Sequence, residues 1–251
     1  STALTSAYTG LRCCGGAFEL LARVTPLRVL AIETSTTLAS VALVEAGHVV
    51  LERAHVRPKQ SAERLLPLIA ELLGEAGWER GSLARIGVSV GPGSFTGLRI
   101  GIACAQGLSL GLGIPLVGVS SLSAVARAVP NDLPGVRCPI LDARRAEVFA
   151  AGYAAGPRAA EVLAPAALPV ATARDTLVGA LGAEVAVVWI GSGLGLLGLT
   201  PSICTPATQE PSAGAVGLLA EELDPAENPA LPVYIRDAGA TLPNLGAPTQ
   251  H

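Results

Sequence analysis

The stretch "SVGPGSFTGLRIG", Ser89–Gly101, lies between two apolar segments of the chain. The segment before it, "LARIGVSVG", has the continuous apolar character of a buried strand, and "TGLRIGIACAQGLSLGLG" predicts a helix from Gly97 to about Leu112. A glycine-rich loop between a strand and a helix presents free backbone N–H groups at a helix N-terminus, which suits an anion. The loop therefore supplies four candidate residues for contact with an anion or a nucleotide: Gly91, Gly93, Ser94 and Thr96.

Two stricter motifs do not fit this loop. A Walker loop requires Gly-Lys-Ser/Thr, whereas Gly97 is followed by Leu98 and Arg99. A G-x-S-x-G nucleophile elbow would place glycine where Thr96 stands, and no histidine is near Ser94 in the sequence. The alternative to an anion site is a tight turn with a structural role only.

Segments on both sides of the loop predict an α/β lobe. From Arg28 onward, "RVLAIET", "ASVALVEAG" and "HVVLERAHV" predict three strands in an antiparallel meander. "SAERLLPLIAELLGEAG" then predicts an amphipathic helix that ends at Gly77. After the loop and its helix, "IPLVGVSS" and "SLSAVARAV" predict a strand and a helix, which complete the order β-β-β-α-β-α-β-α by about Val129.

The second half of the chain predicts another α/β lobe after a linker at Pro130–Pro134. "VRCPILDARRAEVFAAGY" predicts two strands around a polar turn at Asp142–Arg145. A helix near Ala173–Leu181, the strand "AEVAVVWIG" and a last helix, "SAGAVGLLAEEL", follow. Two lobes that each begin with β-hairpins are the simplest account of this order.

The composition excludes several classes of function. Half of the 251 residues are apolar, the net charge is -3, and no basic run exceeds Arg144-Arg145, so the chain alone has no electrostatic surface for nucleic acid. Five cysteines at irregular positions and three separated histidines predict neither a disulfide framework nor a metal site, and indicate a reducing, cytoplasmic setting. The uncharged stretches 100–126 and 185–209 contain turn residues, so buried strand and helix pairs are favoured over membrane spans.

Six segments together carry a resemblance to a known family. They are "LAIETST", "SAERLLPLI", "GVSVGPGSFTGLRIG", "LVGVSSL", "ILDARRAEVFAAGY" and "LPVYIR". In this order and spacing they resemble the bacterial TsaB (YeaZ) family, over about Arg28 to Arg236, and "GPGSFTGLRIG" is the most specific part.

The resemblance implies an α/β fold with two ribonuclease-H-like lobes of the actin, sugar-kinase and Hsp70 superfamily. We expect an N-terminal extension or leader at 1–26 and an N-terminal, partner-binding lobe at 27–130. A C-terminal lobe at 131–236, whose last helix can return to the first lobe, and a tail at 237–251 complete the expected organisation.

The resemblance also implies a part in making threonylcarbamoyladenosine in tRNA. TsaB proteins are similar to the catalytic subunit TsaD but are regarded as its non-catalytic partner. With TsaD and the ATPase TsaE, such a subunit would be a scaffold and activator for threonylcarbamoyl transfer from its adenylate to N6 of adenosine 37, in tRNAs that read codons beginning with A. Two alternatives stay open: an independent ATP-dependent enzyme of the same superfamily, and a serine peptidase built on Ser94.

The residues expected beside a nucleotide depart from the superfamily pattern. Glu33 and Thr34 stand where the superfamily has an aspartate and a glycine, and Ser61 stands where related proteins keep a metal-binding histidine. "WIGSGLG" resembles a degenerate adenosine loop, which accounts for its glycines better than a dinucleotide motif, because no acid follows at the required distance. We therefore expect no metal and no tightly bound nucleotide in the chain alone, and ATP or ADP only at the interface of a complex. The candidate residues beside such an anion are Glu33, Thr34, Ser35, Gly91, Gly93, Ser94, Thr96, Gly191 and Gly193.

Two helices are expected to bind a TsaD-like subunit. The first is amphipathic, and the second has small residues spaced by four on two faces: Gly97, Gly101 and Ala105 on one, and Ala103, Gly107 and Gly111 on the other. The alternative is that both helices only cover their own sheet. A TsaE-like ATPase completes the expected complex, and tRNA is expected to bind only through that complex. No membrane is expected to be involved. Free copies of this chain can pair through the same helical surface. The expected contact residues are Glu63, Leu65, Leu68, Leu72, Gly97, Arg99, Gly101 and Ala105.

Overall fold

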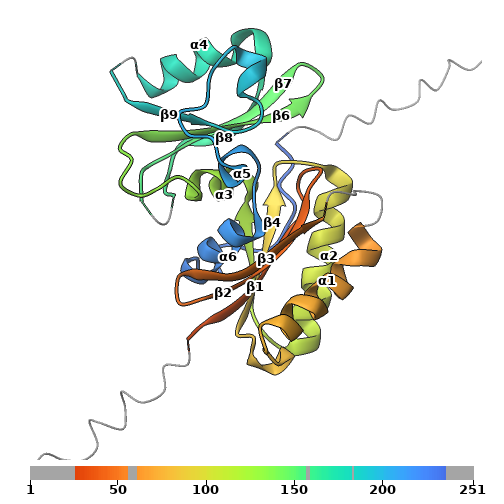
Figure 1. Cartoon of the computed structure of the whole chain (residues 1–251). Coiled ribbons are helices and arrows are strands. Elements are labelled where there is room, and N and C mark those ends of the chain that lie inside the picture. Colours follow the sequence, from red (N-terminus) through yellow and green to blue (C-terminus); the bar gives the residue numbers. More distant parts are fainter. Residues whose placement is uncertain (1–25, 56–60, 157–158, 183, 236–251) are drawn as a thin grey trace, which may run out of the picture.

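The computed structural model describes residues 26–55, 61–156, 159–182 and 184–235, which form two lobes, each built on its own sheet (Figure 1). The expected extension at 1–26, apart from Pro26, and the tail at 237–251 lie outside the described residues. Among the described helices, one is long and apolar enough to cross a membrane by length and composition alone, the helix Phe95–Leu112.

The N-terminal sheet has the strand order β3-β2-β1-β4-β5. β1 pairs antiparallel with β2, and β2 with β3, which confirms the predicted meander. β4 pairs parallel with β1, and β5 pairs parallel with β4. The bounds are β1 Arg28–Glu33, β2 Ala39–Glu45, β3 His48–His55, β4 Arg85–Gly91 and β5 Leu116–Ser120.

Helices cover both faces of this sheet, and the alternation of side chains along β1 decides which residues meet which helices. Leu30 and Ile32 pack with α1 (Ser61–Glu75) and α2 (Phe95–Leu112). Val29 and Ala31 face the other way, toward α3 (Ser121–Arg127) and α6 (Ala213–Glu222). A short 3-10 helix, η2 (Arg80–Ser82), precedes β4.

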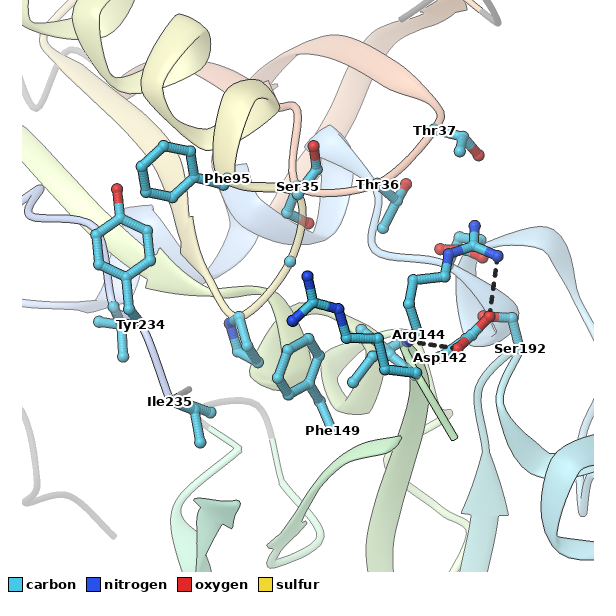
Figure 2. A pocket seen from close by; sticks show the side chains of 18 residues that line it. Ser35, Thr36, Thr37, Phe95, Asp142, Arg144, Phe149, Ser192, Tyr234 and Ile235 are labelled. Atoms are coloured by element: carbon cyan, nitrogen blue, oxygen red, sulfur yellow. Dashed lines mark hydrogen bonds and ion pairs between the residues drawn. The ribbon is translucent and has the colours of Figure 1, made fainter. Parts of the chain in front are cut away.

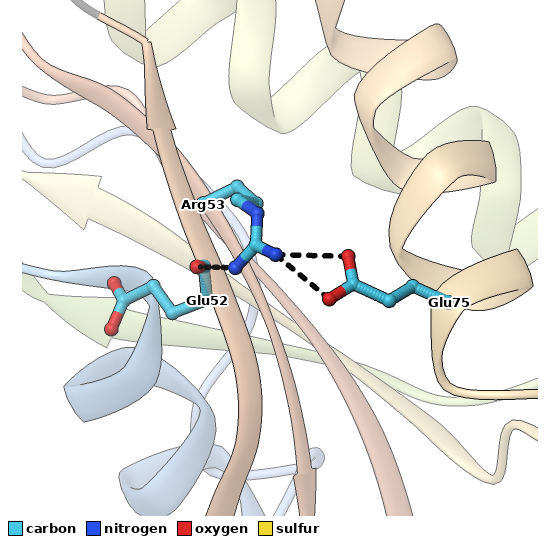
Figure 3. A network of polar contacts seen from close by, with 3 residues as sticks. All are labelled: Glu52, Arg53 and Glu75. Carbon is cyan, nitrogen blue, oxygen red and sulfur yellow. Dashed lines mark hydrogen bonds and ion pairs between the residues drawn. The ribbon is translucent and has the colours of Figure 1, made fainter.

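The edge strand β3 follows the same alternation (Figure 3). Arg53 points toward α1, where its Nη2 atom donates to both carboxylate oxygens of Glu75 at 2.8 and 2.9 Å. The neighbouring Glu52 points to the opposite face and accepts from the backbone N–H of Gly214 in α6 at 3.1 Å. Both members of the Arg53–Glu75 pair are about half exposed, so the pair contributes less than about 1 kcal/mol to stability. Its main significance is to show which face of β3 lies toward α1.

The last helix, α6, packs on the N-terminal sheet although it follows the second sheet in sequence (Figure 1). Glycines allow the close approach: a Cβ atom on Gly87 would overlap Ala220, and one on Gly217 would overlap Val44. Arg85 of β4 closes the far end of the helix, because its Nη1 atom donates to the carbonyl oxygens of Ala220, Glu221 and Leu223 at 2.7, 3.2 and 2.9 Å.

The C-terminal sheet has the order β8-β7-β6-β9 and repeats the pattern of a hairpin followed by a parallel strand. α4 covers its outer face, and α3 lies between the two sheets, where one core joins both lobes. The chain therefore has two α/β lobes that each extend a hairpin by a parallel strand, the ribonuclease-H-like arrangement that was expected. The bounds are β6 Val136–Arg144, β7 Glu147–Tyr153, β8 Glu161–Pro169, α4 Val170–Leu181, β9 Val187–Ile190, η3 Leu194–Leu197 and α5 Pro206–Gln209.

A buried arginine fixes the link between the lobes. The guanidinium of Arg137 donates to the carbonyl oxygens of Gly156 at 2.9 Å and Pro130 at 3.1 Å, and to the side chain of Asn131 at 3.3 Å. Burial lowers the pKa of Arg137, and the nearby charge of Arg127 acts in the same direction. The predicted linker at Pro130–Pro134 is thus held by hydrogen bonds to a cation of the second lobe.

Candidate functional site

The glycines of the opening loop make room for the turn that follows β1. A Cβ atom on Gly93 would overlap the carbonyl oxygen of Ser35, and one on Gly97 would overlap the carbonyl oxygen of Thr34. A Cβ atom on Gly101, one helical turn later, would overlap the Thr34 hydroxyl. The loop and the first turns of α2 are therefore shaped to receive a part of this same chain.

The backbone amides of the loop are also used within the chain. The N–H of Ser94 donates to the carbonyl of Ser35 at 2.6 Å. The Ser94 hydroxyl caps α2 by accepting from the N–H of Gly97 at 3.3 Å, and the N–H of Leu98 donates to the Ser94 carbonyl at 2.9 Å. These three amides are bonded within the chain, which favours the structural turn over an anion site at Ser94. The helix starts two residues before the expected Gly97, because Ser94 is its cap.

Ser94 has no geometry for nucleophilic catalysis. Its hydroxyl is bound to the first turn of α2, and no histidine is among the described residues that line the adjoining cleft. A serine nucleophile needs a base within hydrogen-bonding reach. The peptidase alternative has no support at this position.

The turn after β1 is a buried support. Glu33 is completely buried, and one of its carboxylate oxygens, Oε1, accepts from the backbone N–H of Ser35. The other oxygen, Oε2, has no hydrogen-bond partner among the described residues. Burial raises the pKa of Glu33 to about 7, although hydrogen bonding from Ser35 opposes the shift. Glu33 and Thr34 therefore lie behind the site, and only Ser35 of the three reaches the cleft.

A cleft of about 470 Å³ lies between the lobes (Figure 2). On the N-terminal side it is lined by Ser35–Thr37 and Pro92–Phe95, and on the C-terminal side by Leu141–Arg145 and Phe149. Ser192, Glu210 and the segment Val233–Ile235 complete the lining. Thr96, which was expected beside an anion, is not among these lining residues.

The hairpin between β6 and β7 brings positive charge to this cleft. Arg144 pairs with Asp142 at 3.1 Å, whereas no acid in the described part of the chain forms an ion pair with Arg145. The residues Arg144, Arg145 and Ala146 all have left-handed backbones, with φ of 62°, 54° and 59°. Three consecutive left-handed residues other than glycine are uncommon and carry strain. Sequence reasoning found this polar turn but did not place it opposite the β1 turn.

The second glycine group also packs on its own lobe. The N–H of Gly193 donates to the carbonyl of Ile140 at 2.9 Å, and the N–H of Gly191 donates to that of Thr208 at 2.8 Å. A Cβ atom on Gly191 would overlap the Ile140 carbonyl. The two glycines thus support the end of β6, and neither lines the cleft. Among the described residues, no three histidine, cysteine, aspartate or glutamate side chains gather as a metal site would require.

Half of the expected partner surface lies in the interior. Leu65, Leu72 and Ala105 are buried in the core under α1 and α2, and Gly101 is buried against Thr34. Leu72, Gly101 and Ala105 are used in contacts with this chain's own sheet and turn, whereas Leu65 also lines the groove between α1 and α2. Gly97 is partly exposed but is also packed on the β1 turn.

The outer face of α1 and α2 is nevertheless apolar. Glu63 and Arg99 are exposed and Leu68 is half-buried, in line with the expected surface. Sequence reasoning did not select Leu66, Phe95 and Leu110, which are 53%, 41% and 86% exposed. Leu66 follows Leu65, which belongs to the buried stripe of α1, so an apolar residue next to that stripe was the sequence signal for an exposed apolar face.

A groove runs between α1 and α2 on this outer face, with a volume of about 840 Å³. Of the two small-residue faces predicted for α2, the one with Ala103 and Gly107 opens into the groove, and a Cβ atom on Gly107 would meet nothing within 4 Å. The lining residues are Leu65, Leu66, Phe95, Thr96, Arg99, Ile100, Ala103, Cys104, Gly107 and Leu108.

Comparisons with known proteins agree with this architecture. A family model described as "TsaD: tRNA N6-adenosine threonylcarbamoyltransferase" matches residues 9–177. The chain is 39% identical over 130 residues to the tRNA threonylcarbamoyladenosine biosynthesis protein TsaB of Escherichia coli strain K12, covering 51% of this chain and 55% of the relative. It is 36% identical over 127 residues to the protein of the same name from Bacillus subtilis strain 168, with the same coverage of 51% and 55%. The chain thus spans about half the length of the curated relatives it matches.

Solved structures extend the similarity to both lobes. One is described as an uncharacterized protein with similarity to peptidase YEAZ from Pseudomonas aeruginosa; it is 31% identical, with a TM-score of 0.69 over 84% of this chain and 100% of that one. Another, YeaZ from Pseudomonas aeruginosa, is 30% identical, with a TM-score of 0.65 over 83% of this chain and 99% of that one. The shared motifs, the two-lobed fold and these matches together show that the chain belongs to the TsaB (YeaZ) family.

Proposed function

We propose that this chain is a scaffold and activator subunit in the biosynthesis of threonylcarbamoyladenosine in tRNA. In this role it acts in the cytoplasm with TsaD-like and TsaE-like subunits, which transfer a threonylcarbamoyl group to N6 of adenosine 37 in tRNAs reading codons that begin with A. The names of the relatives point to threonylcarbamoyladenosine biosynthesis as the process. The glycine loop is packed against the turn after β1 of this same chain, which supports a role without catalysis.

The absence of a usable catalytic constellation among the described residues supports this proposal. Glu33 is sealed from solvent, and Ser94 is committed to capping α2. The loop amides of Ser94, Gly97 and Leu98 have partners in the chain. A catalytic acid must reach its substrate, and the buried Glu33 does not; a serine nucleophile needs a base within reach, and no histidine is among the described residues that line the cleft beside Ser94.

The exposed apolar face of α1 and α2 supports a binding role. Leu66, Phe95 and Leu110 present apolar side chains to solvent around a groove, and such patches mark interaction sites. We assign this groove to a TsaD-like subunit. A protein that matches the same family model shares this lobe, so it can present an equivalent pair of helices for face-to-face packing. Pairing of two copies of this chain is the competing occupant.

Nucleotide and tRNA enter this proposal only through the complex. Three amides at the β4–α2 loop, those of Ser94, Gly97 and Leu98, are bonded within the chain, which supports the expectation that the chain alone does not hold ATP or ADP tightly. Arg145 remains as a cation of the cleft that is without an ion-pair partner in the described ranges. The net charge of -3 gives no reason to place tRNA on this chain without its partners.

Reconstitution of the tRNA modification tests the proposal. TsaD-like and TsaE-like subunits are assayed with threonylcarbamoyl-adenylate, ATP and tRNA, with and without this chain. Product is expected only in its presence. Leu66→Arg places a charge in the groove and is expected to reduce both partner binding and product at least about tenfold. Leu196→Arg, at a 48% exposed leucine of the C-terminal lobe, is the matched control and is expected to behave as the wild type.

Three outcomes would overturn parts of this proposal. Full product without the chain would remove the activator role. Loss of self-association without loss of partner binding in Leu66→Arg would assign the groove to a second copy. Tight ATP binding with turnover by the isolated chain, measured by calorimetry with Mg²⁺, would favour the independent ATP-dependent enzyme, for which the cleft near Arg145 is the available site.

A further inference from the structure

The segment Asn228–Ile235 lies beside α2 and fixes one side chain against its first turn. The carbonyl of Asn228 accepts from the N–H of Gly118 at 2.8 Å, and the N–H of Val233 donates to the carbonyl of Val90 at 2.8 Å. The side chain of Gln106 in α2 donates to the carbonyl of Ala230 at 3.4 Å. Asn228, Ala230 and Val233 thus anchor the segment to β5, α2 and β4, and this anchoring places the next residue, Tyr234, beside the first turn of α2.

Tyr234, Phe95 and Arg99 form a three-membered stack at the end of the groove. The rings of Phe95 and Tyr234 lie 5.1 Å apart, and Figure 2 shows them side by side at the cleft. The guanidinium carbon of Arg99 lies 3.8 Å from the centre of the Phe95 ring, and its Nε atom donates to the Tyr234 hydroxyl at 3.3 Å. An arginine held by a ring face and a hydrogen bond has lost much of its side-chain freedom before any partner binds.

No acid among the described residues forms an ion pair with this prearranged cation. Arg99 takes part in none of the ion pairs found between described residues, and its side chain is exposed at the border of the apolar groove. A partner that fills the groove removes water from the guanidinium. Such burial is costly for an unpaired charge, so a fitting partner has to supply an anionic acceptor at this point.

We propose that Arg99 receives a carboxylate side chain of the partner, and that Tyr234 and Phe95 are positioning residues that orient its guanidinium for that contact. The inference rests on the proposed function and adds the chemistry that the partner must present: an apolar ridge for the groove with an aspartate or glutamate at its end. It also extends the interaction surface to a segment more than a hundred residues away in the sequence.

A double-mutant cycle tests the inference. Affinity for the TsaD-like subunit is measured by calorimetry at low and high salt for the wild type, Arg99→Ala, Arg99→Lys, Tyr234→Phe and the double variant. Arg99→Ala is expected to weaken binding about tenfold at low salt and to reduce the salt dependence. Arg99→Lys is expected to recover only part of the loss, because an ammonium group does not make the two-pronged contact. Arg80→Ala, at an exposed arginine outside the groove, is the charge control.

The positioning role predicts a specific lack of additivity. Tyr234→Phe keeps the ring and removes the hydroxyl that holds Arg99, so it is expected to weaken binding about threefold in the wild type and not at all in Arg99→Ala. Equal effects in both backgrounds would assign Tyr234 a role independent of Arg99. Wild-type affinity and salt dependence in Arg99→Ala would overturn the carboxylate contact while leaving the groove assignment intact. Absence of binding by the wild type itself would overturn the proposed function and this inference together.

Discussion

The two lobes have the same packing arrangement at the ends of their central strands but differ in the charged side chains found there: a buried acid in the first lobe and exposed arginines in the second. In the N-terminal lobe, glycines after β4 accommodate the turn after β1, and in the C-terminal lobe, glycines after β9 accommodate the end of β6. The N-terminal turn is closed over and contains the buried acid Glu33, whereas the C-terminal hairpin is open and carries Arg144 and Arg145. The comparison separates two roles: the first turn supports the fold, and the second is free to meet a ligand or a partner.

The largest expected effect comes from filling the space under the N-terminal turn. Gly97→Ala is expected to lower the free energy of unfolding by about 3 to 5 kcal/mol, because the new Cβ atom meets a backbone carbonyl that has little freedom to move. Gly107→Ala on the same helix is the matched control and is expected to raise stability by up to about 1 kcal/mol, since nothing lies within 4 Å. Urea denaturation measures both. Similar effects of the two substitutions would refute the close-packing role of the loop.

The buried acid is expected to make stability depend on pH. The pKa of Glu33 is about 7 in the folded chain against 4.5 for the unperturbed group, so the folded state retains a proton that the unfolded state has lost. Its contribution is therefore fully present below pH 4.5, and about 3 kcal/mol is lost as pH rises from there through 7. Glu33→Gln should remove this part of the pH dependence in denaturation curves between pH 4.5 and 8. An unchanged slope relative to the wild type would show that the carboxyl is not buried in solution.

The smallest expected effect concerns the strained hairpin of the C-terminal lobe. Ala146 has φ of 59°, so Ala146→Gly is expected to raise the free energy of unfolding by about 0.5 to 1 kcal/mol. The substitution keeps both arginines, and thermal unfolding is the measurement. A decrease in stability would mean that the left-handed backbone at this position is not a source of strain.

Much of the fold follows from sequence because its signals are local. The meander from Arg28, the helix that starts at Ser61 and the strand-loop-helix unit around Gly91 are confirmed, since each has its own periodicity and its own turn residues. The order of elements and the family motifs then suffice for two lobes of known type.

The candidate surface was harder to predict because it depends on which way a helix faces. Gly97, Gly101 and Ala105 have the same spacing as Ala103, Gly107 and Gly111, and only the position of the β1 turn decides that the first set is inside. Leu65 and Leu66 are equally apolar, yet one is buried and the other is 53% exposed. The cleft and the Tyr234 contact join segments far apart in sequence, and no local pattern encodes such a meeting.

The placement of α6 has a consequence for biosynthesis. One face of the N-terminal sheet, with Val29, Ala31 and Val117, is covered by residues that include Val216 and Leu219 of α6. During translation these strands leave the ribosome long before the helix that shelters them. The lobe that is made first therefore cannot complete its core until nearly the whole second lobe has been synthesised, and an apolar sheet face waits uncovered in the meantime. We expect nascent chains that stop before Ala213 to depend on chaperones, whereas chains that include Glu222 can close both lobes.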